Sequence, residues 1–485
     1  MATSFIDRIN MHSKPIELTA LRKADINFSV PFEIKMDDNP HTLHCLEILR
    51  IVPGKRVVAF ANWNGKTVVA KLFYGTKQYT HCEREVTGIS VLIKEGIPTP
   101  ALLARETAMG GNIQILIFEK LQDAIGLDVI WRNKPADAKL FRLLQILTME
   151  LATQHVLGVL QKDLHLKNFM LANKKIYTID GGSIVGFNHP LSKRKSLRNL
   201  GLFFSELGVG TDELQNKLFD TYIKARSWFV KSKDKQFLNK VIKEHNRERW
   251  QKFEKKMERS STGFARVKHR QQVMMYDRHW ITPALLAYLQ QPEQFFNLPG
   301  VRLLKNGRSS TVISINVENH ELIIKRYNMK NIFHWLRRCL RTSRAVKNWR
   351  FAHLLRLFGI ATPKPLAYIE KRFFGLRSES YIIMEKVNGL HLGDYLMLVN
   401  NDEAAKAKIA SRTKQMLASL SKLKITHGDL KMTNILVENN RPVLIDLDGM
   451  QEHKNKHSLI KKTIKERQRF LENWSFDPQL QQLFL

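Results

Sequence analysis

Two sets of polar residues, 266 positions apart, repeat the same spacing. In each set an Asp precedes an Asn by five residues, and that Asn precedes a second Asp by twelve: Asp163, Asn168 and Asp180, then Asp429, Asn434 and Asp446. Phosphoryl transfer needs such groups, since it depends on positioning the reactants and neutralising phosphate charge. We expect the first Asp to take the proton of an attacking hydroxyl, and the Asn and second Asp to bind magnesium. A surface loop with an N-capping Asp is the alternative, which two copies in register disfavour.

A strand, a turn and a second strand fit the interval between the Asn and the second Asp. In the second copy, residues 434–438 and 443–445 are strand-like and 439–442 form an Asn- and Pro-containing turn. The first copy repeats this with strands at 169–171 and 176–179 around Asn173. The hairpin predicts that each set folds back on itself and brings its ends together.

The length and the repeat together predict two domains. A chain of 485 residues, 44% of them hydrophobic and 25% charged, suits two cores better than one. We expect an α+β fold of two tandem protein-kinase-like domains, each with a small β-rich N-lobe and a mostly helical C-lobe. The predicted boundaries are 40–250 for the first domain, 251–285 for a connector and 286–485 for the second.

The charge balance predicts polyanionic partners. There are 78 Lys and Arg against 45 Asp and Glu, which gives a formal charge of +33. Neither a membrane-spanning apolar stretch nor a signal peptide is found, so a cytoplasmic location is expected. The three cysteines, Cys45, Cys82 and Cys339, lack the spacing of a zinc site or disulfide framework.

Each half carries one lysine on a β-branched strand upstream of its catalytic loop. Lys71 and Lys325 are placed to bind the α- and β-phosphates of ATP. The following helices end at Gly-Ile-Pro-Thr-Pro (96–100) and Gly-Ile-Ala-Thr-Pro (359–363), and eleven residues before each glycine lie Glu85 and Asn348. Glu85, with Glu83 as the neighbouring alternative, is the expected ion-pair partner of Lys71. Asn348 cannot form an ion pair, so the second half either uses another acid or has a weakened nucleotide site.

Further candidates surround this nucleotide site. Gly307, Ser309 and Ser310 form a turn that offers donors to phosphate, whereas Gly65 is typical of a plain hairpin. Other predicted contacts are Glu119 and Glu385, which end the strands expected to lead into an adenine-binding hinge, and Lys431, which lies two residues after Asp429 and near the γ-phosphate. His165 holds the position of Lys431 in the first half. Asp448 either adds a second metal contact or caps a turn.

These residues and motifs resemble the bacterial lipopolysaccharide core kinases of the heptose-kinase and InaA-like group, which have an atypical protein-kinase-like fold. The motifs are residues 96–100, 163–168, 305–312, 325–328, 349–350 and 445–448, and the likeness extends over about 45–470. It implies phosphorylation of a sugar hydroxyl, an inner-core heptose, with ATP and Mg²⁺ as cofactors. It assigns the base to Asp163 or Asp429, metal binding to Asn168 with Asp180 or Asn434 with Asp446, and phosphate binding to Lys71 and Lys325. Gln161 and Lys162 replace the His-Arg pair of protein kinases, which argues against activation by phosphorylation.

The expected partners follow from the resemblance and the charge. They are the lipopolysaccharide core glycolipid and the anionic inner face of the bacterial inner membrane, where the protein would be peripheral. Basic clusters at 193–198, 337–341 and 461–469 fit such docking. No specific nucleic acid is expected, because only charge suggests one, and no oligomeric state is predicted. A scaffold with one or both domains inactive, or a protein Ser/Thr kinase, is the alternative function.

Overall fold

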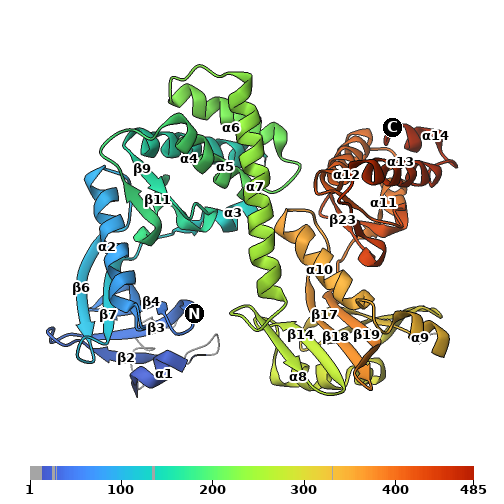
Figure 1. Cartoon of the computed structure of the whole chain (residues 1–485), viewed down its shortest axis with the longest axis horizontal. Coiled ribbons are helices and arrows are strands. Elements are labelled where there is room, and N and C mark those ends of the chain that lie inside the picture. Colours follow the sequence, from blue (N-terminus) through green and yellow to red (C-terminus); the bar gives the residue numbers. More distant parts are fainter. Residues whose placement is uncertain (1–13, 24–27, 29, 134–136, 330) are drawn as a thin grey trace. The chain divides into compact units, whose positions relative to one another are not determined.

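The structure is a computed structural model that describes residues 14–23, 28, 30–133, 137–329 and 331–485 (Figure 1). The chain divides into two compact units, residues 1–206 with 213–245 and residues 207–212 with 246–485. Both units mix helices and strands, which confirms the α+β class.

Unit 1 begins with a seven-stranded sheet and one long helix packed on it. The strand order is β1-β2-β3-β4-β5-β7-β6. The elements are β1 (Lys14–Pro15), α1 (Leu18–Lys23), β2 (Phe32–Lys35), β3 (Thr42–Val52), β4 (Arg56–Trp63), β5 (Lys66–Phe73), α2 (Gln78–Lys94), β6 (Leu102–Ala108) and β7 (Ile113–Glu119). Val57, Ala59 and Ala61 alternate with less buried neighbours along β4. This period of two fixes which face of the sheet meets the core.

The rest of unit 1 is mainly helical and holds the first catalytic loop. It contains β8 (Ile125–Gly126), α3 (Leu127–Asn133), α4 (Asp137–Val156), β9 (Val159–Gln161), η1 (Leu166–Asn168), β10 (Phe169–Ala172), β11 (Lys175–Thr178), η2 (Gly181–Ser183), β12 (Ile184–Gly186), α5 (Lys193–Glu206), α6 (Asp212–Ala225) and α7 (Ser232–Met257). The β10–β11 hairpin is the one predicted between Asn168 and Asp180. Helix α7 continues into unit 2.

Unit 2 repeats the sequence of sheet, helix and hairpin. Its sheet has the order β13-β14-β18-β19-β17-β16-β15. The elements are β13 (Phe264–Lys268), β14 (Gln272–Asp277), α8 (Pro283–Gln290), η3 (Pro292–Asn297), β15 (Arg302–Asn306), β16 (Ser310–Val317), β17 (His320–Tyr327), α9 (Ile332–Arg338), α10 (Arg344–Leu357), β18 (Pro365–Phe373) and β19 (Leu376–Glu385). The helical part has β20 (Leu390–His391), α11 (Leu392–Leu398), α12 (Glu403–Lys422), β21 (Ile425–Thr426), η4 (Met432–Asn434), β22 (Ile435–Glu438), β23 (Arg441–Leu444), η5 (Leu447–Gly449), β24 (Gln451–Glu452), α13 (Lys456–Glu472) and α14 (Pro478–Gln482).

The two sheets share five central strands and differ at their edges. The orders β3-β4-β5-β7-β6 and β15-β16-β17-β19-β18 are equivalent, and Lys71 and Lys325 both lie on the middle strand. Unit 1 adds β1 and β2 beside β3, whereas unit 2 adds β13 and β14 beside β18. The repeated core therefore carries different additions on opposite edges.

Within the described residues, no helix combines the length and apolarity needed to cross a membrane. All three cysteines are free and buried.

Candidate active sites

In each predicted catalytic loop, the Asn of the repeated set forms hydrogen bonds that close the loop. In unit 1 the side-chain amide of Asn168 donates to the backbone oxygen of Asp163 at 2.7 Å, and the backbone N–H of Ile179 donates to the Asn168 backbone oxygen at 2.8 Å. Unit 2 repeats the two bonds at 2.8 and 2.9 Å. Because the amide nitrogen is used within the loop, the Asn side-chain oxygen is the atom left for a ligand.

The second Asp of each set has a left-handed backbone. Asp180 has φ 70° and ψ 78°, and Asp446 has φ 59° and ψ 60°. This conformation is uncommon for a residue with a side chain, although Asp tolerates it better than most. It ends the β11 and β23 strands abruptly at the site, in the same way in both units.

In unit 1 the strand lysine is paired with the helix glutamate. Lys71 forms a short ion pair with Glu85, whose side chain is fully buried in α2. The Glu85 carboxylate also accepts backbone N–H bonds from Gly181 at 2.9 Å and Gly182 at 3.1 Å. Glu83 pairs instead with Arg105. One buried carboxylate thus joins the lysine strand, helix α2 and the turn after Asp180.

A second cation, Arg56 on β4, reaches the same cluster. Its guanidinium lies 3.3 Å from the Asp180 carboxylate and 3.9 Å from that of Glu85. Burial raises the pKa of Asp180, but the charges of Lys71 and Arg56 outweigh it and lower the pKa to about 2. Asp180 is therefore ionised at neutral pH, as a magnesium ligand requires.

His165 connects the predicted catalytic Asp of unit 1 to an acid that is distant in sequence. Its ring nitrogens lie 2.9 Å from the carboxylates of Asp163 and Glu206. Hydrogen bonding to Asp163 and then to Glu206 raises the pKa of His165 to about 9. The hydrogen bond from His165 in turn lowers the pKa of Asp163. His165 is thus a cation at neutral pH, the charge that Lys431 carries in unit 2.

A cleft of about 580 Å³ opens beside these groups in unit 1. Its polar lining includes Lys71, Asn168 and Asp180, together with Glu119, the last residue of β7. Its apolar lining comes from both the sheet and the β10–β11 hairpin: Val58, Phe60, Val69, Met170 and Ile179. An apolar slot with cations and a carboxylate at one end suits a nucleotide.

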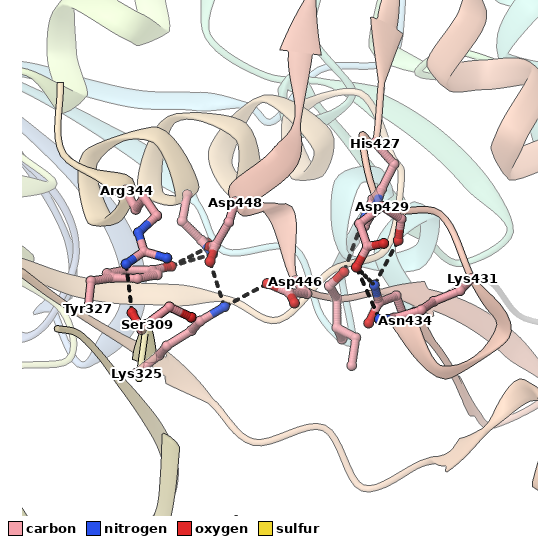
Figure 2. Close-up of polar contacts among 12 residues, drawn as sticks. Ser309, Lys325, Tyr327, Arg344, His427, Asp429, Lys431, Asn434, Asp446 and Asp448 are labelled. Carbon is pink, nitrogen blue, oxygen red and sulfur yellow. Dashed lines mark hydrogen bonds and ion pairs between the residues drawn. The ribbon is translucent and has the colours of Figure 1, made fainter. Parts of the chain in front are cut away.

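In unit 2 the strand lysine binds two acids of the loop. Figure 2 shows Lys325 between Asp446 and Asp448, at 2.6 and 2.7 Å from their carboxylate oxygens. Burial lowers the pKa of Lys325, but the charges of Asp448 and Asp446 reverse this and raise it. Lys325 therefore stays protonated although it is buried.

Asp448 pairs with the strand lysine of unit 2, as Glu85 does in unit 1. Its other oxygen accepts hydrogen bonds from Tyr327 and, at 3.2 Å, from the side chain of Asn348. Asp448 follows Asp446 by two residues, as Gly182 follows Asp180, so the acid has moved from the helix to the loop. Of the two possibilities left by Asn348, the structure favours another acid.

In unit 2 the predicted catalytic Asp lies close to two cations. Asp429 lies 3.1 Å from Lys431 and 3.8 Å from Arg469 of α13. The backbone N–H groups of His427 and Gly428 donate to Glu466, also on α13. The His427 ring hydrogen-bonds with the Ile445 backbone oxygen at 2.9 Å (Figure 2). The helix after the metal loop thus fixes the start of the catalytic loop.

The remaining predicted residues lie at turns and strand ends. The Gly307 N–H donates to the Ser310 backbone oxygen at 3.0 Å, and the Ser309 backbone oxygen accepts from Arg344 at 2.6 Å. Ser310 is buried in β16. Glu119 accepts from the Ala101 N–H at 2.9 Å, and Glu385 lies 3.2 Å from Lys364. Both glutamates therefore have structural partners.

Several site residues were not predicted from the sequence. Tyr327 lies two residues after Lys325 on the same strand, so the period of two places both on one face and would have indicated it. Arg56, Glu206 and Glu466 reach the site from elements far away in sequence. No local pattern marks them.

The donor atoms present fit magnesium and ATP phosphates. Each site offers at least one carboxylate and one amide oxygen beside a lysine, and Mg²⁺ is commonly held by one or two carboxylates together with substrate phosphates. Among the described residues, no group of three or more His, Cys, Asp or Glu suited to an ion occurs. Such a group is not needed when phosphates and waters complete the coordination.

In unit 2 a lysine, a loop Asp, an Asn and a second Asp lie in one site, and these are residue types that phosphoryl transfer by kinases uses. Residues 305–483 match the model of the Lipopolysaccharide kinase (Kdo/WaaP) family. The C-terminal part of the chain is therefore similar to the family that its sequence motifs resemble, which confirms that resemblance over residues 305–483.

Other comparisons add little. A solved structure described as "WaaP in complex with acyl carrier protein" aligns with 41% of this chain and 88% of its own, at 18% identity and a TM-score of 0.32. A similarity at that level supports no inference about this chain. The comparison with curated proteins found no match.

Proposed function

We propose that the chain is an ATP- and magnesium-dependent kinase that phosphorylates a sugar hydroxyl, a heptose, of the lipopolysaccharide inner core. The proposal includes two tandem kinase-like domains, at 40–250 and 286–485 with a connector at 251–285. The observation that carries it is the family match over 305–483 together with the same lysine, Asp, Asn and Asp arrangement in both units.

The residues divide the work of phosphoryl transfer. Lys71 and Lys325 bind phosphates, and Asp163 or Asp429 accepts the proton of the sugar hydroxyl. Asn168 with Asp180, and Asn434 with Asp446, would hold magnesium, which neutralises charge on the transferred group. His165 and Lys431 each place one cation beside the catalytic Asp. The protein would act at the cytoplasmic face of the inner membrane on the core glycolipid.

The test measures ATP turnover with purified lipopolysaccharide core as acceptor. Asp163→Asn and Asp429→Asn are compared singly and together, with Asp38→Asn, an exposed carboxylate, as the matched control. We expect the double variant to lose at least about 100-fold in rate, since a positioned base contributes roughly 10²–10⁴. Parental turnover in the double variant would overturn the assignment. Loss in one single variant alone would identify the working unit.

A scaffold with an inactive unit is the second candidate. It is favoured by one observation, that unit 2 lacks the helix glutamate and uses Asp448 instead. The same experiment separates the kinase and the scaffold candidates. If unit 2 is inactive, acceptor-dependent turnover should be the same in Asp429→Asn as in the parent.

A further inference from the structure

One surface of unit 2 exposes large apolar side chains. It consists of α9, the residues that follow it and the tip of the β18–β19 hairpin, and its apolar members are 55–89% exposed: Ile332, Phe333, Leu336, Leu340, Phe373 and Phe374. Helix α9 lies beside the ends of these strands (Figure 1). We call this the α9 surface. Burying such side chains in water-free surroundings is strongly favourable, so their exposure needs a reason.

The α9 surface is fixed to the sheet. The Trp335 indole N–H donates to the Arg377 backbone oxygen at 3.0 Å, and its ring packs edge-on against Phe373 at 6.1 Å. The Arg377 N–H donates to the backbone oxygen of Cys339, which is buried. The exposed residues are therefore presented by an anchored element.

The same surface is an addition to the repeated core. Lys71 precedes Glu85 by 14 residues, whereas Lys325 precedes Asn348 by 23, and α9 occupies the added length. In unit 1, Lys71 forms its ion pair with Glu85 of α2 although no such element lies between them. The α9 segment is thus dispensable for the lysine site.

Phe374 stands where turn geometry disfavours it. It has φ 47° and is followed by Gly375 at φ 79°, the left-handed pair of a two-residue hairpin. In the other two-residue hairpins of units 1 and 2 the first residue of the equivalent pair is Asn64, Asn173, Asn439 or Glu318, and none of these is aromatic. An aromatic residue that is both strained and 89% exposed serves something other than the turn.

Arginines flank the apolar residues. Arg338, Arg341, Arg344 and Arg377 line one small pocket. Within the described part of the chain, Arg338 and Arg341 form no ion pair with a carboxylate. Burial and then the charges of the neighbouring arginines lower the pKa of Arg338. An anion entering this pocket would relieve that repulsion.

We propose that the α9 surface docks the protein on an anionic lipid bilayer, with Phe333, Leu340 and Phe374 inserted at the headgroup boundary and the arginines on lipid phosphates. Apolar tips of two separate elements, ringed by guanidinium groups, match the two layers of that boundary. The chain's charge of +33 adds attraction to the same partner. This inference deepens the membrane location of the proposed function by assigning it to one surface, and its test needs neither ATP nor a sugar acceptor.

The test is flotation of the full chain with phosphatidylcholine vesicles, without and with phosphatidylglycerol. We expect binding only to the anionic vesicles. Phe374→Asn should weaken it about tenfold, and Arg338→Gln and Arg341→Gln about fivefold each. Asn suits the turn better than Phe, so the unfolding midpoint of Phe374→Asn should not fall. Phe229→Asn is the matched control, since Phe229 is 81% exposed but belongs to unit 1.

Three outcomes would overturn the proposal. They are absence of binding to anionic vesicles, unchanged binding of Phe374→Asn, and an equal loss in Phe229→Asn. The first would leave an acidic protein as the occupant of the surface. Because no nucleotide is present, none of these outcomes depends on whether the chain is a kinase.

Discussion

At the scale of single residues, Glu85 and Asp448 pair with the strand lysines from different elements, and Lys325 also binds Asp446. Glu85 comes from helix α2 and bonds the backbone of the loop, whereas Asp448 comes from the loop and bonds Asn348 of helix α10. Each lysine therefore has a carboxylate partner, but that carboxylate comes from the helix in unit 1 and from the loop in unit 2. The sequence alone showed only that position 348 lacks an acid.

Because a helix acid and a loop acid play the same part, a helix glutamate should be able to replace Asp448 as the partner of Lys325. Asp448→Gly should lower the free energy of unfolding by about 1–3 kcal/mol, because buried Lys325 loses one acid. Asn348→Glu alone should also destabilise, since it adds a carboxylate beside Asp448. Together the changes should recover most of the loss in urea unfolding. A double variant as unstable as the sum of the single variants would contradict this replacement.

His165 predicts a pH dependence of stability. Its folded pKa, about 9, lies above the ordinary value of 6.5. Its contribution is therefore fully present below pH 6.5 and is lost as the pH rises through 9. Unfolding free energies of parent and His165→Gln should differ by about 1–2 kcal/mol at pH 6 and converge by pH 10. Exposed His189→Gln is the control, and a difference independent of pH would disprove the ion pair.

At the scale of elements, unit 1 depends on a very close approach of helix α2 to the metal loop. A Cβ on Gly88 would lie 1.9 Å from the Gly181 backbone oxygen, and one on Gly181 would lie 2.5 Å from that of Glu85. The corresponding residues of unit 2, Phe351 and Leu447, are buried in one core cluster. The two units therefore set the helix–loop distance differently.

Gly88→Ala should move the loop that carries Asp180. In an ordinary helix this change stabilises by about 1 kcal/mol, but here we expect a loss of about 2–4 kcal/mol, as for overpacking against backbone. Nucleotide affinity of unit 1 should fall with it. Gly201→Ala is the comparison, because its Cβ would meet the Val241 side chain at 2.7 Å rather than a backbone atom. A Gly88→Ala protein more stable than the parent would refute the close contact.

The sequence predicted the elements better than the contacts between them. Hairpin β22–β23 and the Lys71–Glu85 pair follow from local alternation and from spacing to the helix-ending Gly96, so both were expected. The Glu206 contact with His165 and the Glu466 contacts with the second loop depend on how distant helices pack. Spacing along the chain carries no information about such packing.

At the scale of the whole molecule, the two units share a core of five strands, and each unit adds different elements to it. The five central strands keep their order, while the extra strands are added beside β3 in unit 1 and beside β18 in unit 2. Helix α9 is a further addition in unit 2. The additions leave both lysine strands central, so they alter the surfaces more than the sites.

Because both lysine sites are assembled, each unit should bind its own nucleotide. Titration of the full chain with a non-hydrolysable ATP analogue and Mg²⁺ should give about two sites. Lys71→Met or Lys325→Met should each leave about one nucleotide site, because methionine carries no charge to attract the phosphates. Lys66→Met, exposed on the same strand as Lys71, should leave two. If the parent bound one nucleotide and Lys325→Met did not reduce it, unit 2 would be an inactive partner of unit 1 and the scaffold interpretation would hold for that half.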